Sequence, residues 1–217
     1  MSGQNPAYDP VKFPHRELTE RIEACAHVFG QARLPLIVRI TPFTLPEELD
    51  AMLAQRGLRR FDDTRVMVAT APADGATLAP RLTAHAMGLE AFAQRVGGLR
   101  GSALAQRQAH AERLLSSPVP FFAYELRQDG EPVSCGQFAL EGNLVGLYDV
   151  FTADAVRGRG YAAALCRHML AQANVRGARH AYLQVEAGNL AARAVYKRLG
   201  FSDAYAYHYR TDDPFVA

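Results

Sequence analysis

Apolar residues recur at helical spacing near the start of the chain. Between residues 15 and 32, Leu18, Ile22, Cys25 and Phe29 are separated by four, three and four positions. This spacing places the four side chains on one face of a helix. The pattern therefore predicts an amphipathic helix that buries this face.

A strand, a helix and a second strand are predicted next. The run Leu36–Ile40 is rich in β-branched residues, which favour strands. Thr44 followed by Glu47 matches a capping box and predicts that a helix begins there. Gly57 is suited to end that helix, because glycine tolerates the left-handed backbone of a helix C-terminus. The second strand is predicted at Thr64–Ala71.

The rest of the chain predicts further elements, separated by turn-forming residues. Two helices are expected, at Glu90–Val96 and Ala105–Leu115. Short turns join the next three strands, so we expect an antiparallel meander. Its strands are predicted at Phe121–Arg127, Val133–Leu140 and Leu144–Thr152. The last four predicted elements are a helix at Gly158–Asn174, a strand at Ala181–Glu186, a helix at Leu190–Leu199 and a strand at Tyr205–Arg210.

The order helix, strand, helix, glycine, strand occurs twice, in residues 15–71 and again in residues 160–210. Two interpretations stay open: an internal half-repeat, or two unrelated segments with ordinary helix ends. The small, polar and turn-forming stretch 71–77 predicts a linker. We therefore expect an N-terminal αβ region at 1–77 and a second domain at 78–217.

Composition and charge narrow the class of protein. The 217 residues include 24 basic and 22 acidic side chains, a net charge of +2, which argues against a nucleic-acid-binding domain. The sequence contains no stretch of about 18 apolar residues, so it predicts no membrane-spanning helix. Residues 1–10 lack the charged and then apolar order of a secretory signal. The three cysteines share no CxxC spacing and fit thiols of a reducing compartment. We expect a cytoplasmic protein without membrane contact.

A glycine-containing loop is the first candidate for chemistry. The run Arg157-Gly158-Arg159-Gly160-Tyr161-Ala162 lies between a predicted strand and a predicted helix. Unpaired N–H groups at the start of a helix, together with its positive dipole end, favour an anion such as a pyrophosphate. The two arginines would add charge-assisted contacts. A plain tight turn would look similar, but the run matches neither a Walker loop nor a dinucleotide fingerprint.

The second candidate lies in the predicted helix at 190–199. Asn189 is placed to cap the N-terminus of this helix, and Gly200 to end it. Asn189, Arg193 and Tyr196 fall near one face, away from the aliphatic side chains. Tyr196 therefore suits either a cleft or a half-buried structural position.

Together these two segments resemble the GNAT superfamily of acetyl-CoA-dependent N-acetyltransferases. The cofactor loop of that family has the form Gln/Arg-x-x-Gly-x-Gly/Ala, which Arg157, Gly160 and Ala162 match. The family's Asn, alanine-rich turn, Tyr and Leu-Gly-Phe are matched by Asn189, Ala191-Ala192, Tyr196 and Leu199-Gly200-Phe201. The resemblance is strong from about residue 121 to 210 and weaker back to the helices near 90–115.

The resemblance implies an α+β fold, with a mixed, mostly antiparallel central sheet flanked by helices. It also implies acetyl transfer from acetyl-CoA to a primary amine of a small molecule or peptide, with Tyr196 as the acid that protonates the departing thiolate. The pantetheine arm would lie along Val150, Phe151 and Thr152, with Asn189 contacting it or a bound water. The pyrophosphate would lie on the amides of Arg157, Gly158, Arg159, Gly160, Tyr161 and Ala162.

Direct attack of an amine on a thioester needs no covalent enzyme intermediate, and a backbone N–H on the strand before the loop can stabilise the oxyanion. Asp149 and Glu186 are the candidate general bases, each with an ordinary solvated or hydrogen-bonded carboxylate as the alternative. Cys166 is expected to pack, and His208 to be an ordinary strand histidine. The histidines lack metal-ligand spacing, so no metal is predicted.

The N-terminal region has two interpretations. It is either a degenerate GNAT-like half, in which Leu53 stands where Tyr196 stands in the second copy, or an extension whose strand at 64–71 serves as the family's first strand. For the chain as a whole, the rival function is a non-catalytic acyl-CoA-binding or sensor module with the same fold. The sequence also leaves a homodimer open.

Overall fold

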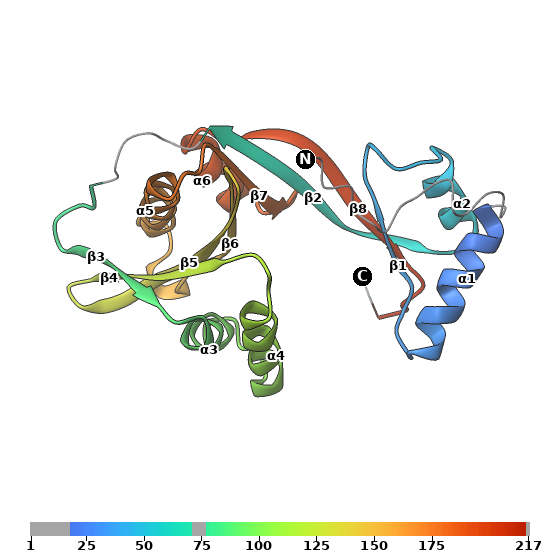
Figure 1. Ribbon diagram of the computed structural model, residues 1–217, viewed down its shortest axis with the longest axis horizontal. Coiled ribbons are helices and arrows are strands. Elements are labelled where there is room, and N and C mark those ends of the chain that lie inside the picture. Colours follow the sequence, from blue (N-terminus) through green and yellow to red (C-terminus); the bar gives the residue numbers. More distant parts are fainter. Residues whose placement is uncertain (1–17, 71–76, 216–217) are drawn as a thin grey trace. The chain divides into compact units, whose positions relative to one another are not determined.

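The computed structural model describes residues 18–70 and 77–215 (Figure 1). Its helices are α1 (Leu18–Gln31), α2 (Leu49–Gln55), α3 (Leu89–Leu99), α4 (Leu104–Leu115), α5 (Tyr161–Val175) and α6 (Leu190–Arg198), with a 3₁₀ turn at Asp154–Val156. Its strands are β1 (Ile37–Ile40), β2 (Arg59–Thr70), β3 (Leu82–Met87), β4 (Phe121–Gln128), β5 (Glu131–Glu141), β6 (Leu144–Thr152), β7 (His180–Glu186) and β8 (Ser202–Thr211).

The strands hydrogen-bond in the order β1-β8-β2-β7-β6-β5-β4-β3. The pairs β1/β8, β2/β7, β3/β4, β4/β5 and β5/β6 are antiparallel, whereas β6 and β7 are parallel. The predicted mixed, mostly antiparallel sheet flanked by helices is therefore confirmed, including the meander β4-β5-β6. At the turn between β4 and β5, Asp129 and Gly130 both have positive φ, as a tight hairpin turn requires.

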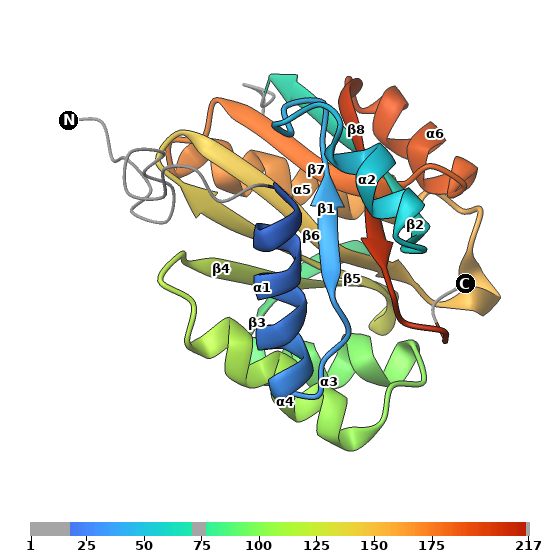
Figure 2. The ribbon, with the colours of Figure 1, turned by 90° about the vertical axis from the view of Figure 1, so that its right-hand side faces the viewer.

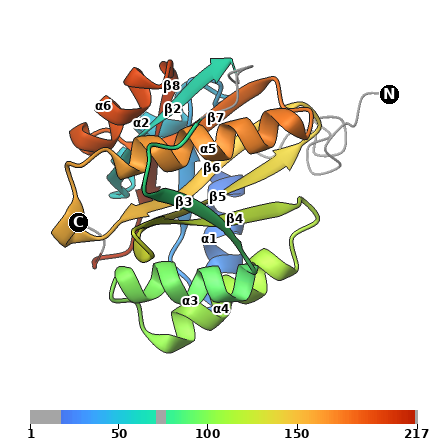
Figure 3. The same ribbon diagram turned by 90° about the vertical axis from the view of Figure 1, so that its left-hand side faces the viewer.

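The chain divides into two compact units, the larger of which runs from Thr64 to Ala206. In this unit α5 packs on one face of the meander and the α3–α4 pair on the opposite face (Figure 3). The alternation of side chains along β4 explains the two layers. Tyr124 and Leu126 join the cluster under α5, and Ala123 joins the cluster under α3 and α4.

The smaller unit contains residues up to Asp63 together with the C-terminal segment that begins at Tyr207. Here α1 lies beside β1 (Figure 2), because the apolar face of α1 buries Ile22 against Ile40 and Leu53. The helical spacing read from the sequence is confirmed for Leu18, Ile22 and Phe29, which belong to this cluster. It is wrong for Cys25, which is exposed, and the adjacent Ala26 packs against the cluster instead.

The two helix–strand–helix–strand segments expected from the sequence are both present, as α1-β1-α2-β2 and α5-β7-α6-β8. In each, a glycine with positive φ follows the second helix: Gly57 at +85° and Gly200 at +90°. Exchanging the two segments turns the strand order β1-β8-β2-β7 into β7-β2-β8-β1, which is the same order read in reverse. A common origin of the two segments stays a prediction.

Two expectations about the N-terminal region are wrong. The strand after the predicted linker is not missing: β3 pairs with β4, while β2 pairs with β7, so β2 is not the first strand of the meander. Strand β3 was not predicted, because its two alanines have low strand propensity. Thr44 does not cap α2, which begins at Leu49; its hydroxyl instead accepts a hydrogen bond from the Thr41 N–H at 2.9 Å.

Most of the predicted linker, residues 71–76, lies outside the described residues. The domain boundary at 77/78 therefore stays a prediction. The chain passes from one compact unit to the other between Asp63 and Thr64, and back again between Ala206 and Tyr207. The remaining predicted elements are present, with ends shifted by a few residues. The largest shift is in β2, which begins at Arg59 rather than Thr64.

Candidate functional site

Strands β6 and β7 separate halfway along β6. Their parallel pairing ends at Leu147 and Leu183, while β6 stays paired with β5 as far as Thr152. At the point of separation Asp149 has a φ of +50°, and the register between β5 and β6 shifts. A bulge of this kind bends a strand and re-aims its side chains. Residues 148–152 therefore have one edge that no strand of the described structure pairs.

The glycine loop follows β6 and leads into α5. Gly158 and Gly160 have φ values of +79° and +83°, a region that glycine enters without a Cβ clash. Gly160 is the N-cap of α5, and no side chain caps that helix. In the described structure the backbone N–H groups of residues 158–163 have no recorded acceptor. A Cβ built at either glycine would meet no atom within 4 Å, so the loop borders open space.

Arg157 is held beside the end of β6. Its guanidinium contacts the Asp154 carboxylate at 2.6 Å, donates to the Thr152 carbonyl at 3.3 Å and lies 5.3 Å from the centre of the Phe151 ring. Arg159 is exposed. The side chain of Tyr161 points away from the loop, because it is buried in the core and its hydroxyl contacts Gln128. Tyr161 can therefore serve an anion only through its backbone amide.

Asn189 caps α6 as the sequence predicts: its Oδ1 accepts a hydrogen bond from the Ala192 N–H at 3.1 Å. Seven residues later, Tyr196 is half-buried on α6, with its ring 6.0 Å from that of Phe201. Burial raises the pKa of the Tyr196 hydroxyl, and the nearby Cys166 thiol adds to the effect. The hydroxyl therefore keeps its proton at neutral pH, as a proton donor must.

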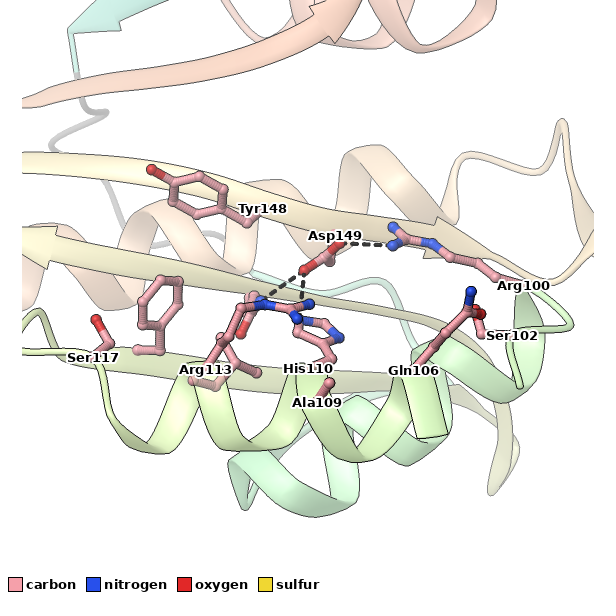
Figure 4. Close-up of a pocket in the computed structure, with 12 residues that line it drawn as sticks. Arg100, Ser102, Gln106, Ala109, His110, Arg113, Ser117, Tyr148 and Asp149 are labelled. Carbon is pink, nitrogen blue, oxygen red and sulfur yellow. Dashed lines mark hydrogen bonds and ion pairs between the residues drawn. The ribbon is translucent and has the colours of Figure 1, made fainter. Parts of the chain in front are cut away.

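A pocket of about 730 Å³ lies between α4 and the point where β6 bends (Figure 4). Helix α4 and the segment before it contribute Ser102, Gln106, His110 and Arg113, and β6 contributes Tyr148 and Asp149. Figure 4 shows the α4 side chains and Asp149 directed toward the same space. The pocket therefore adjoins the residues of β6 that precede Val150.

Asp149 is the most heavily contacted group in this pocket. Its Oδ1 accepts from the Arg100 guanidinium at 2.8 Å, its Oδ2 accepts from the Gln137 amide at 2.8 Å, and the His110 ring lies 3.4 Å from Oδ2. Gln137 is 1% exposed, and its Oε1 has no hydrogen-bond partner in the described structure. A buried acceptor without a partner costs about 1–3 kcal/mol, so this polar cluster is kept at some expense of stability.

Glu186, the other predicted base, ends β7 on an exposed position opposite Thr64. It does not line the pocket beside Asp149. The structure therefore brings only one of the two candidate carboxylates next to the α4 side chains.

Sequence reasoning missed the residues that α4 supplies. Gln106, His110 and Arg113 are spaced by four and three positions, which places them on one helix face, while Ala111 and Leu114 are buried on another. This polar stripe was the available signal. What the sequence lacked was the knowledge that the stripe faces the bulge at Asp149.

Cys166 and His208 have the structural roles expected from the sequence. Cys166 is fully buried, and burial raises the pKa of its thiol to about 12, so the thiol packs rather than reacts. His208 contacts the Asp50 carboxylate at 3.0 Å, and Arg210 contacts the same carboxylate at 2.7 Å. The described residues contain no group of three or more potential metal ligands, and no described helix is long and apolar enough to cross a membrane.

The bulged strand, the glycine loop and the capped helix all lie within residues 92–201, the part of the chain that was found to match a family of proteins. Residues 92–201 match the Acetyltransferase (GNAT) family, which is half of the chain. The chain therefore belongs to the GNAT acetyltransferase family, whose members generally use acetyl-CoA as a co-substrate. No curated protein matches the chain in sequence.

Solved structures of the same fold cover nearly the whole chain. A GCN5-related N-acetyltransferase from Kribbella flavida has 20% identity and a TM-score of 0.70, with 95% of this chain and 77% of that chain covered. One from Sphaerobacter thermophilus has 18% identity and a TM-score of 0.68, with 93% and 69% covered. A tandem GNAT protein from the clavulanic acid biosynthesis pathway has 16% identity and a TM-score of 0.69, with 92% and 72% covered. At these identities the likeness establishes the fold alone.

Proposed function

We propose that the protein is an N-acetyltransferase that moves an acetyl group from acetyl-CoA to a primary amine. One observation carries this proposal: β6 leaves β7 after Leu147, and the glycine loop that follows β6 has amides without an acceptor at residues 158–163. A strand edge without a partner offers backbone donors and acceptors to an extended amide-containing chain. The pantetheine arm of acetyl-CoA has this chemistry.

The proposed cofactor residues follow from the same geometry. Val150, Phe151 and Thr152 lie on the free edge of β6 and would hold the pantetheine arm. The amides of Gly158, Arg159, Gly160, Tyr161 and Ala162 would hold the pyrophosphate, because they combine unpaired N–H groups with the positive end of α5. The Arg157 N–H already donates to the Asp154 carbonyl at 3.3 Å, so Arg157 would contribute its side chain rather than its amide. Asn189 would contact pantetheine through its side-chain amide, since its Oδ1 already accepts from Ala192.

The reaction needs no covalent enzyme intermediate. A neutral amine attacks the thioester carbonyl carbon, the carbon–sulfur bond breaks, and the departing thiolate gains a proton while the amine loses one. An amide N–H on the free edge of β6 would stabilise the oxyanion. Tyr196 would donate its hydroxyl proton toward the sulfur, which its raised pKa permits because the proton is present at neutral pH.

The group that takes the amine proton is proposed to act from the pocket. Both oxygens of Asp149 already accept hydrogen bonds, from Arg100 and Gln137. The His110 ring lies within 3.4 Å of the same carboxylate, an arrangement that orients an imidazole for proton transfer. We therefore place Asp149 as the residue that positions His110, and His110 as the base that takes the proton directly or through a water.

A non-catalytic acyl-CoA sensor with the same fold is the competing function. The proton-donating tyrosine and the carboxylate–imidazole pair favour the enzyme, because a binding module uses neither group. The test is release of free CoA thiol from acetyl-CoA by the full chain with a panel of amines, alongside acetyl-CoA binding measured by calorimetry. Amine-dependent release supports the enzyme. Tight binding without release by any amine would support the sensor and overturn the proposal.

A further inference from the structure

Basic side chains outnumber acidic ones in the lining of the pocket between α4 and β6. Its lining includes two guanidinium groups, Arg100 and Arg113, and one imidazole, His110, against a single carboxylate, Asp149. Arg100 is paired with Asp149 at 2.8 Å, so these two charges largely cancel for a ligand that enters the pocket. The remaining fixed charge is the positive charge of Arg113.

Arg113 is free to bind a ligand. No ion pair or side-chain hydrogen bond of its guanidinium is recorded within residues 18–70 and 77–215, whereas Arg95, Arg100, Arg127 and Arg157 each pair with a carboxylate. Figure 4 shows its side chain projecting from α4 beside His110, toward the space below β6. A guanidinium presents a planar set of donors that fits a carboxylate with two parallel hydrogen bonds.

The apolar part of the lining limits what else the acceptor carries. Phe121 and Tyr148 have ring centroids 5.7 Å apart, and Leu114 adds an aliphatic side chain. These residues give the pocket an apolar part beside the charged groups of α4. A ligand with a carboxylate at one position and an apolar body would satisfy both parts of the pocket.

We infer that the acceptor is an amine that also carries a carboxylate, such as an amino acid, and that Arg113 binds this carboxylate. The inference rests on the proposed function, since it assigns the acceptor of the same reaction. With the carboxylate on Arg113, the amine would lie near His110 and the bend of β6. A polycationic acceptor such as a polyamine is disfavoured, because the pocket offers it no unpaired carboxylate and a repelling guanidinium.

The test compares matched amines with the full chain and acetyl-CoA. Each pair consists of an amino acid and the amine left after its decarboxylation, for example phenylalanine and 2-phenylethylamine, with both α- and ω-amino acids in the panel and spermidine as a polycation. We expect kcat/KM to favour the carboxylate-bearing member of at least one pair by about tenfold or more, the scale of a charge-assisted bidentate contact.

The variant Arg113→Gln should bring this ratio close to one, mainly through a higher KM for the carboxylate-bearing amine. The matched control is Arg167→Gln, which removes an exposed arginine from α5, on the opposite face of the meander. It should keep the ratio of the wild type. Because both readouts are ratios within one protein, a general loss of folded enzyme does not change them.

Three outcomes would overturn the inference. They are acetylation of amines that lack a carboxylate with no amino acid preferred, a preference that survives in Arg113→Gln, and preferred acetylation of spermidine. Each of these leaves the proposed acetyl transfer standing. A chain that releases no CoA with any amine would contradict the proposed function itself, and the inference would fall with it.

Discussion

The segments α1-β1-α2-β2 and α5-β7-α6-β8 have the same order of elements and different surroundings at matching positions. In the first, Leu53 on α2 is fully buried in a cluster with Ile22 and Ile40. In the second, Tyr196 on α6 is half-buried and has a hydroxyl with no recorded hydrogen-bond partner in the described structure. The framework is thus compatible with either a packing residue or a proton donor at this position.

The helix N-termini differ in the same way. α5 begins after two glycines with positive φ, and its first amides are left open. The sequence before α1 contains no glycine between residues 4 and 29, so it cannot supply the same loop. The comparison indicates that the two segments share an αβαβ frame, while a few residues at the helix ends of the second would carry the proposed chemistry.

The largest expected effect is a fall in the kcat of the proposed acetyl transfer when Tyr196 is replaced by phenylalanine. The substitution removes the hydroxyl and keeps the ring that packs on Phe201. General acid catalysis typically contributes about 10²–10⁴-fold. Since burial raises the tyrosine pKa further above that of an ordinary thiol, we expect a fall in kcat of about 10²-fold, near the lower end. Steady-state kinetics should show little change in the KM for acetyl-CoA.

A fall in kcat of less than about threefold would make Tyr196 a packing residue like Leu53. An unchanged kcat with a large rise in KM for acetyl-CoA would instead make it a pantetheine-binding residue. The first result would remove the chemical difference between the two segments at this position, and the second would change it from proton donation to ligand binding.

The matching change in the first segment, Leu53→Ala, should act on stability. Truncating a fully buried leucine costs about 2–5 kcal/mol, because the cavity closes only in part. We expect a lower urea midpoint and, for the molecules that remain folded, an unchanged KM for acetyl-CoA. The control Leu53→Met keeps the volume and should cost less than about 1.5 kcal/mol. A stable Leu53→Ala protein with a raised KM would contradict the division of roles.

The sequence was sufficient for most of the second segment and for the frame of the first. Periodicity found the buried face of α1 except for Cys25, which is exposed. The Asn189 and Gly200 signals identified both ends of α6. Sequence reasoning missed β3, which pairs with β4 although it contains two alanines. Strand propensity depends on the residue itself, whereas strand pairing depends on residues far away in the chain. Sequence reasoning also misplaced the start of α2, because the Thr44 hydroxyl bonds the Thr41 amide instead of capping the helix.

The candidate site was predictable only where a motif is continuous in the chain. The loop at 157–162 and the cap at Asn189 are short local patterns. His110, Arg113 and Arg100 come from a different part of the chain and meet Asp149 only through the packing of α4 against the meander. Tertiary convergence of this kind leaves no fixed spacing in the sequence.

The smallest expected effect concerns the ion pairs of Asp50 with His208 and Arg210 in the smaller unit. The hydrogen bond from Arg210, and then the contact with His208, lowers the pKa of Asp50 from 3.8 to about 2. A lowered folded-state pKa contributes stability above the unfolded value, and this contribution is lost as the pH falls from about 4 through 2. Because the carboxylate is 35% exposed, solvent screening keeps the effect modest.

Melting temperatures measured from pH 7 to pH 2 should therefore be lower for Asp50→Asn than for the wild type at neutral pH, and the two should converge near pH 2. Parallel curves over the whole range would show that Asp50 does not stabilise the smaller unit through its charge. In that case the ion pairs of Asp50 could no longer be contrasted, as stabilising interactions, with the unpaired amides at the start of α5.

The most direct test of the central claim, that the α5 end of the second segment holds acetyl-CoA, is the thermal shift caused by acetyl-CoA in Gly160→Ala and in Gly177→Ala. Both glycines have positive φ and open surroundings, one at each end of α5, so both substitutions carry similar backbone strain. A ligand at about 100 times its Kd stabilises the folded state by about 2.7 kcal/mol. We predict that the wild type and Gly177→Ala show this shift and that folded Gly160→Ala loses most of it. An undiminished shift in folded Gly160→Ala would contradict the claim.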